Sequence, residues 1–116
     1  MTSKNTLPKE QAAQKIDTLQ PELLNLSHRI HSYKEIGFNE FQSVAAIAEL
    51  LDAQGFTYIK PAGGLETAII ATVGTTDHPH VAILAEYDAL AEIGHGCGHN
   101  VIATCAVGAF LGAASV

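Results

Sequence analysis

Residues 86–100 read EYDALAEIGHGCGHN and join two apolar segments, residues 81–85 (VAILA) and residues 101–116 (VIATCAVGAFLGAASV). The joining stretch holds three carboxylates, two imidazoles and one thiol within fifteen residues. This mixture of ligand types indicates a metal site, because metal ligands are commonly placed where a rigid element ends. We therefore expect a buried strand before the stretch, a buried helix after it, and a site between them.

The N-terminal third of the chain has the pattern of helices. Residues 8–34 carry apolar side chains at alternating steps of three and four, which is the spacing of one helical face. Pro21 interrupts this run, and we expect it to begin a second helix because proline is tolerated in the first helical turn. A further amphipathic helix is predicted over residues 40–54, capped by Asn39 with Gln42 and ended at Gly55.

Short apolar or β-branched runs follow, and turn residues separate them. Residues 56–59, 67–73 and 81–85 have the length and composition of strands, and the last two read as buried strands. Strands beneath helices predict an α/β layer. In open α/β sheets, ligands bind at the carboxyl ends of the strands, and residues 86–100 begin at such an end.

Composition indicates a folded domain and argues against a nucleic-acid partner. Hydrophobic residues make up 47% of the 116 positions, which is enough for a real core. Twelve acidic residues against six basic ones give a net charge of -6, and Arg29 is the only arginine. The chain therefore lacks the basic patch that phosphate backbones require, and we expect no nucleic-acid partner.

We expect no membrane span, a cytoplasmic location and reduced cysteines. Residues 101–116 lack charge but fall short of the roughly 20 residues that a span needs, so a buried central helix is predicted there. Residues 2–6 are polar, so no secretory signal is visible. Cys97 and Cys105 lie eight positions apart, too far along one helix for a disulfide. Cys97 is then free for chemistry, whereas Cys105 is expected to be buried.

The chemistry of residues 86–100 centres on a short Gly-rich turn. Cys97 and His99 flank a single glycine, so both side chains can converge on one metal centre or on two adjacent ones. Glu86 and Asp88 are two residues apart, so on a strand they share one face and both can point toward this turn. Asp88 is a candidate to orient a metal-bound group through a hydrogen bond, whereas the role of Glu86 stays open.

Other polar residues are better explained by solvent exposure, local hydrogen bonding or packing than by metal binding. Glu92 and His95 could be ligands or solvent-facing side chains, and a locally hydrogen-bonded loop histidine is the preferred interpretation of His95. The pair His28 and His31 has the spacing of a helical surface or packing pair. We expect no metal at either of these positions.

Three stretches resemble the N-terminal motifs of the metal-dependent aminoacylase and amidohydrolase family, which belongs with the di-zinc exopeptidases. They are EYDAL at 86–90, GHGCGHN at 94–100 and HSYKEIGF at 31–38. The family includes hippurate, indoleacetyl-amino-acid and aminobenzoyl-glutamate hydrolases, and the resemblance extends from about residue 23 to about residue 111. Asn100 stands where many members have Asp, which resembles the aminobenzoyl-glutamate and dipeptide-hydrolysing subgroup.

The resemblance implies a two-metal hydrolase of N-acyl amino acids or dipeptide-like substrates. Cys97 and His99 match its metal ligands, and Asp88 matches the aspartate of its Asp-Ala-Leu motif, a catalytic position. The ions would be zinc or manganese, with cobalt or nickel also compatible. In such enzymes the metals polarise an amide carbonyl and acidify a water, and a glutamate of a Glu-Glu pair is the general base. This chain contains no Glu-Glu pair.

The fold that the resemblance implies is the N-terminal part of a three-layer sheet-and-helix metallopeptidase catalytic domain. Residues 1–116 would then be an incomplete catalytic domain that stops within a buried helix and is inactive alone. The full-length form is expected to be a homo-oligomer. Two alternatives remain open: a thiol hydrolase with Cys97 as nucleophile and His95 or His99 as base, and a stand-alone metal-binding or interaction module.

Overall fold

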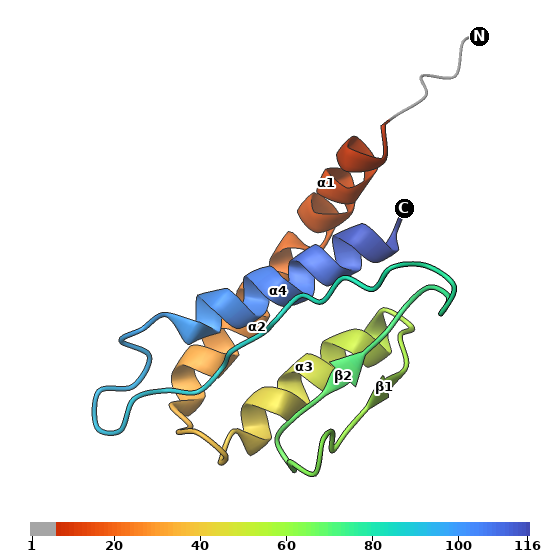
Figure 1. Cartoon of the computed structure of the whole chain (residues 1–116). Helices are drawn as coiled ribbons and strands as arrows, with labels where there is room; N and C mark the ends of the chain where they lie inside the picture. Colours follow the sequence, from red (N-terminus) through yellow and green to blue (C-terminus); the bar gives the residue numbers. More distant parts are fainter. Residues whose placement is uncertain (1–6) are drawn as a thin grey trace, which may run out of the picture.

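A computed structural model describes residues 7–116 (Figure 1). The prediction that residues 1–6 carry no secretory signal falls outside the described residues. Helices and strands follow in the order α1 (Pro8–Thr18), α2 (Gln20–Tyr33), α3 (Phe41–Ala53), β1 (Tyr58–Ile59), β2 (Ile70–Ala71) and α4 (His99–Ala114). Within residues 7–116, no helix is long and apolar enough to cross a membrane.

The two helices predicted over residues 8–34 are confirmed, and the chain bends between them. α1 ends at Thr18, α2 begins at Gln20, and Pro21 lies in the first turn of α2 as the sequence predicts. Leu19 joins the two helices and is only 4% exposed. The bend therefore turns an apolar side chain into the core.

α3 also forms where it was predicted, but its cap is different. Glu40, not Asn39, is the residue that precedes the helix, and it makes no side-chain cap. The carboxylate of Glu35 takes this role: it accepts hydrogen bonds from the backbone N–H groups of Gln42 (2.8 Å) and Ser43 (2.7 Å). The predicted cap was wrong because a carboxylate from the preceding loop satisfies the free N–H groups of the first turn. Gly55 ends the helix in the left-handed region at φ 81°, as predicted.

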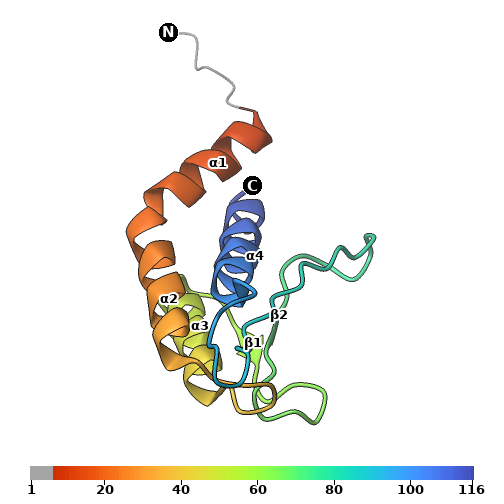
Figure 2. The ribbon, with the colours of Figure 1, turned by 90° about the vertical axis from the view of Figure 1, so that its left-hand side faces the viewer.

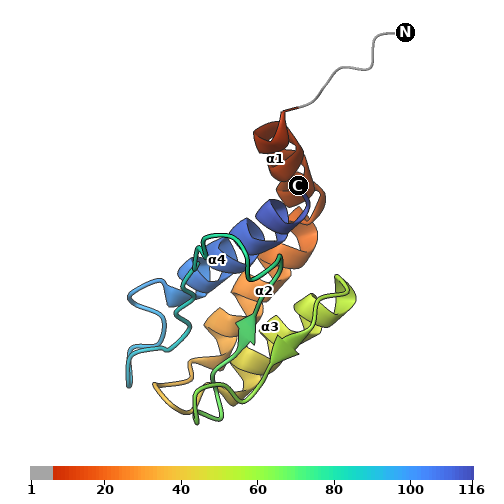
Figure 3. The ribbon, with the colours of Figure 1, turned by 45° about the vertical axis from the view of Figure 1, so that its right-hand side comes forward.

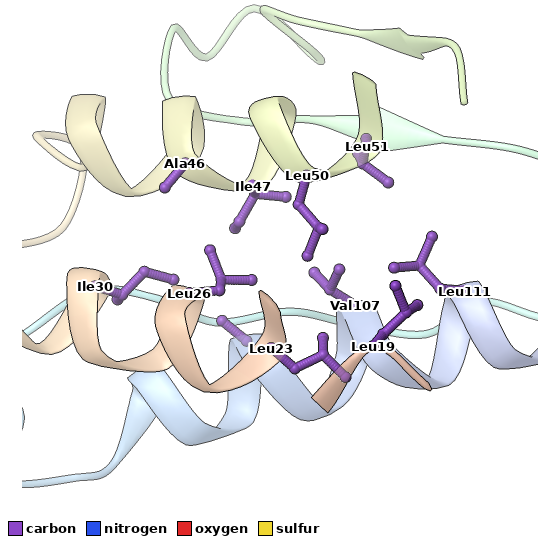
Figure 4. Packing of buried hydrophobic residues seen from close by; sticks show 11 residues of the cluster. Leu19, Leu23, Leu26, Ile30, Ala46, Ile47, Leu50, Leu51, Val107 and Leu111 are labelled. Atoms are coloured by element: carbon purple, nitrogen blue, oxygen red, sulfur yellow. The ribbon is translucent and has the colours of Figure 1, made fainter. Parts of the chain in front are cut away.

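The core lies between α2, α3 and α4 (Figure 4). α2 and α3 contribute the apolar stripes that their sequence spacing predicts, and α4 contributes one side of a helix that is apolar all round. The innermost side chains, Ile30 and Leu111, are fully buried. The cluster consists of Leu19, Leu23, Leu26, Ile30, Ala46, Ile47, Leu50, Leu51, Ala103, Val107 and Leu111. Burial of these side chains is the main force that holds the three helices together.

Glycines let α4 approach the two N-terminal helices closely. Gly108 faces Leu23, and a Cβ at Gly112 would lie 2.9 Å from Ile16 and 3.1 Å from the carbonyl oxygen of Ala12. Larger side chains at these positions would push the helices apart. The C-terminal end of α4 accordingly lies beside α1 (Figure 3).

α4 is less buried than the sequence predicts. One face is covered by α1 and α2, but Val101 is 54% exposed and Ile102 is 40% exposed. Cys105, expected to be buried, is exposed, and both cysteines are free thiols. These side chains are exposed because α4 carries apolar residues on all sides, whereas the other helices cover only one side of α4 within residues 7–116.

The β layer is smaller than predicted. β1 and β2 form one antiparallel pair in which Tyr58 lies opposite Ala71. The segment 81–85 is extended but belongs to no strand of the described structure, and Val81 is 90% exposed. The prediction of two buried strands in residues 67–85 is thus wrong: only Ile70–Ala71 pairs, since no described strand offers the ladder hydrogen bonds that 81–85 would need.

The extended segment 81–85 nevertheless lies alongside α4 (Figures 1 and 2). Figures 1 and 2 show it passing back along α4, on the side opposite α2. A cavity of about 90 Å³ remains between Ile83 of the segment, Ile69 beside β2 and Phe110 of α4. Helices packed on one face of a small β layer confirm the predicted α/β class. This arrangement delivers residues 86–100 to one end of α4.

Candidate functional site

The start of the site is fixed to the loop that follows α2. The backbone N–H of Ala89 donates to the carbonyl of Glu35 at 2.6 Å, and Ile36 and Ala89 form an isolated parallel bridge. The chain then turns back tightly, because Leu90 and Gly94 exchange two backbone hydrogen bonds of 2.9 Å. Residues 86–90 are therefore held in an extended form although they belong to no sheet.

Gly94 and Gly98 shape the turn that leads into α4. Both have positive φ values, 81° and 75°, which favour glycine. A Cβ at Gly94 would lie 3.4 Å from the side chain of Lys34, which is an ordinary van der Waals distance, so the positive φ and not a lack of space favours glycine there. Gly98 precedes the first residue of α4, and that residue is His99. His99 therefore lies where a rigid element begins.

The imidazole of His99 lies between two carboxylates. Its Nδ1 is 2.7 Å from Oδ1 of Asp88 and 3.0 Å from the backbone oxygen of Asp88, while its Nε2 is 3.3 Å from Oε2 of Glu86. The His99 side chain is 22% exposed, against 42% for Asp88 and 59% for Glu86. Glu86 and Asp88 thus reach the same ring, as expected for residues two apart in an extended chain.

Tyr87, between the two carboxylates, contacts a different part of the protein. Its hydroxyl donates a hydrogen bond to the backbone oxygen of Thr67. Thr67 Oγ1 donates to Oε2 of Glu40 at 2.7 Å, and Oε1 of Glu40 accepts from the backbone N–H of Phe38 at 2.7 Å. Burial raises the pKa of Tyr87 to about 12, and the charge of Glu40 acts in the same direction. Tyr87 is therefore a protonated donor at neutral pH.

These contacts form a supporting network behind the site, which we define as Glu40, Thr67 and Tyr87. Glu40 is only 7% exposed and Thr67 only 5%. Because Tyr87 is anchored on this network, its neighbours Glu86 and Asp88 are held with their side chains at His99. The sequence alone does not reveal this network, because Glu40 and Thr67 are separated by 27 positions and neither lies in a pattern that marks a partner.

The N-terminal turn of α4 is also tied to α2. Asn100 is 7% exposed, and its Nδ2 donates to Oγ of Ser27 at 3.0 Å and to the backbone oxygen of Ser27 at 3.5 Å. Many members of the aminoacylase and amidohydrolase family, which the motifs resemble, have an aspartate here. An aspartate has no donor for the Ser27 carbonyl. The amide thus fixes the residue next to His99 against the neighbouring helix.

Cys97 lies on the exposed turn before α4, between Gly96 and Gly98. Within residues 7–116, no group of three or more His, Cys, Asp or Glu side chains lies close enough to hold a metal ion. Of the three predicted site residues, the structure brings Asp88 and His99 together, and it leaves Cys97 two positions away along the chain on an exposed turn.

The residues present fit a divalent metal by their donor chemistry. A histidine that binds a metal through one ring nitrogen commonly has its other ring nitrogen hydrogen-bonded to a carboxylate or carbonyl, and Asp88 offers both groups to Nδ1 of His99. Nε2 of His99 and the thiol of Cys97 are both established types of zinc ligand. The described residues thus supply part of a ligand set.

His95 differs from the prediction of a locally hydrogen-bonded histidine. Both of its ring nitrogens are buried and have no hydrogen-bond partner among the described residues. Its ring lies 6.0 Å from the ring of His31, measured between centroids. Burial lowers the pKa of His95, and His31 lowers it further. The lowered pKa favours the neutral ring, which packs beside His31 of α2.

The chain is similar in sequence to several proteins of known function. It is 35% identical over 102 residues to one of the subunits of p-aminobenzoyl-glutamate hydrolase from Escherichia coli strain K12, covering 73% of this chain and 21% of that protein. It is 34% identical over 115 residues to Xaa-Arg dipeptidase of Mus musculus, and the match covers 91% of this chain and 27% of that protein. It is 29% identical over 119 residues to N-acetyl-L-cysteine deacetylase of Bacillus subtilis strain 168, covering 90% and 28%.

The chain spans only 21–28% of the length of these relatives. No protein-family model matches it. The relatives nevertheless share one kind of name, since a hydrolase of an aminobenzoyl amino acid, a dipeptidase and a deacetylase of an acylated amino acid all cleave amide bonds. Aminobenzoyl-glutamate hydrolase is one of the family members that the motifs at residues 31–38 and 86–100 resemble. By its sequence, the chain belongs to the aminoacylase and amidohydrolase family.

Proposed function

We propose that the full-length protein hydrolyses the amide bond of N-acyl amino acids or dipeptide-like substrates, and that divalent metal ions are needed for this reaction. The observation that carries the proposal is the setting of His99 at the first residue of α4. Its Nδ1 faces the carboxylate and the carbonyl of Asp88, so the hydrogen of the neutral ring lies on Nδ1 and the lone pair of Nε2 is free for an ion. The names of the relatives supply the substrate class.

Each site residue has a defined part in this proposal. Cys97 and His99 bind the metal ions, zinc or manganese, and Asp88 holds the imidazole in the orientation and tautomer that ligation requires. A bound divalent ion would polarise the amide carbonyl and acidify a water molecule. The supporting network keeps Asp88 at His99 while substrate binds and product leaves.

Two proposed ligands are fewer than a two-metal centre needs. We therefore infer that further ligands and the general base come from other parts of the full-length protein, in line with the 21–28% of the relatives' length that this chain spans. On this account residues 1–116 alone are inactive. Assembly into a homo-oligomer is part of the same proposal.

The test is hydrolysis by the full-length protein before and after metal removal. We expect release of the free amino acid from acetylated amino acids, aminobenzoyl-glutamate or dipeptides, measured by chromatography. Treatment with EDTA should abolish this activity, and added zinc or manganese should restore it. Activity that survives EDTA would contradict metal dependence and favour a mechanism in which Cys97 is the nucleophile.

A further inference from the structure

The carboxylate of Glu86 lies beside Nε2 of His99, whereas Asp88 lies beside Nδ1 of the same ring. Because two oxygen atoms of Asp88 face Nδ1, that nitrogen carries the hydrogen of the neutral ring, and Nε2 presents a lone pair. Oε2 of Glu86 lies 3.3 Å from Nε2 and offers lone pairs of its own. Two such acceptors repel each other unless a positive charge lies between them, and that charge is either a proton on Nε2 or a bound cation.

The separation of the two atoms suits a shared metal ion. Zinc binds imidazole nitrogen and carboxylate oxygen at about 2.0–2.2 Å, so two neighbouring ligand atoms in tetrahedral geometry are about 3.4 Å apart. In octahedral geometry with bonds of the same length, the separation is about 3.0 Å. The 3.3 Å between Nε2 of His99 and Oε2 of Glu86 falls within this range.

The two carboxylates near His99 are therefore not equivalent. Asp88 occupies Nδ1, the nitrogen that does not bind metal, whereas Glu86 lies on the side of Nε2. The side chain of Glu86 is also 59% exposed, so an ion can reach it from solvent. Tyr87 keeps Glu86 on this side, because the Tyr87 hydroxyl donates a hydrogen bond to the backbone oxygen of Thr67.

We propose that Glu86 is a ligand of the metal ion that His99 binds, so that Nε2 of His99 and Oε2 of Glu86 hold one ion between them. The proposal rests on the proposed metal dependence and adds a ligand to it. It also explains why a carboxylate stands two residues before Asp88: an extended chain needs that spacing to place one carboxylate at each nitrogen of a single ring.

The test is the affinity of the full-length protein for zinc and for manganese, measured by competition with a chelating dye. Glu86→Gln keeps the size of the side chain and removes the charge. We expect the dissociation constant for the metal to rise about tenfold or more, a modest loss because water can replace an exposed carboxylate. Glu66→Gln is the matched control, since Glu66 is exposed and the same charge is lost.

Salt separates a ligand from a distant charge. At 1 M salt the screening length falls to about 3 Å, so a long-range effect of the Glu86 charge disappears, whereas loss of a direct ligand remains. Unchanged affinity in Glu86→Gln, or a loss seen at 0.1 M salt that vanishes at 1 M, overturns the proposal and leaves the proposed function intact. Absence of metal binding by the unsubstituted protein overturns both.

Discussion

Asp88→Asn is expected to weaken metal binding by about 10–100-fold and to lower kcat/KM at least as much. In the structure, Oδ1 of Asp88 is 2.7 Å from Nδ1 of His99 and accepts its hydrogen. Asparagine can turn its NH₂ group toward Nδ1, which favours the other tautomer and places the ring hydrogen on Nε2. That hydrogen occupies the lone pair on which metal binding depends.

Dye competition and steady-state kinetics on the full-length protein measure this effect. Asp77→Asn is the matched control, because Asp77 is exposed on the loop before the extended segment and the same charge is removed. If Asp88→Asn binds metal and turns over substrate like Asp77→Asn, then Asp88 does not control the tautomer of His99, and our account of the site is wrong.

Glu40→Leu is expected to destabilise the protein by about 1–3 kcal/mol, because one buried donor and one partly buried donor lose their acceptor. These donors are Oγ1 of Thr67 and the backbone N–H of Phe38, both 2.7 Å from the Glu40 carboxylate. Leucine is similar in volume, so the loss reflects hydrogen bonding and not a cavity. Urea unfolding followed by circular dichroism gives the free energy of unfolding of each variant.

Two further variants make this result specific. Glu40→Gln retains one acceptor and should lose less stability than Glu40→Leu. Glu49→Gln breaks a 2.8 Å ion pair with Arg29 at the surface and should cost far less, since exposed ion pairs contribute little. A loss in Glu40→Leu no greater than in Glu49→Gln would show that the supporting network does not stabilise the fold.

The helices could be predicted from the sequence because their signals are local. The apolar spacing of residues 8–34, the position of Pro21 and the stop at Gly55 depend on neighbours within a few positions, and all appear in the structure. Strand prediction is weaker because a strand needs a partner. Residues 81–85 have strand composition, yet the described residues provide no strand that pairs with them.

The site was predictable to the extent that it is local. The two-residue spacing of Glu86 and Asp88 predicted that both carboxylates can point toward the turn that holds Cys97 and His99, and in the structure both lie at His99. The Glu40–Thr67 contact and the Asn100–Ser27 contact bridge 27 and 73 positions, so only the tertiary fold reveals them. The apolar sequence around Cys105 suggested burial, but packing covers the other face of α4.

The most direct test of the metal centre is the metal content of the full-length protein, measured by elemental analysis beside two cysteine variants. Cys97→Ala and Cys105→Ala each remove one exposed thiol, and they differ in whether the thiol lies on the turn before His99 or on α4. We predict that Cys105→Ala retains the metal content of the unsubstituted protein and that Cys97→Ala loses metal. Equal metal content in all three proteins would contradict the assignment of Cys97 as a ligand.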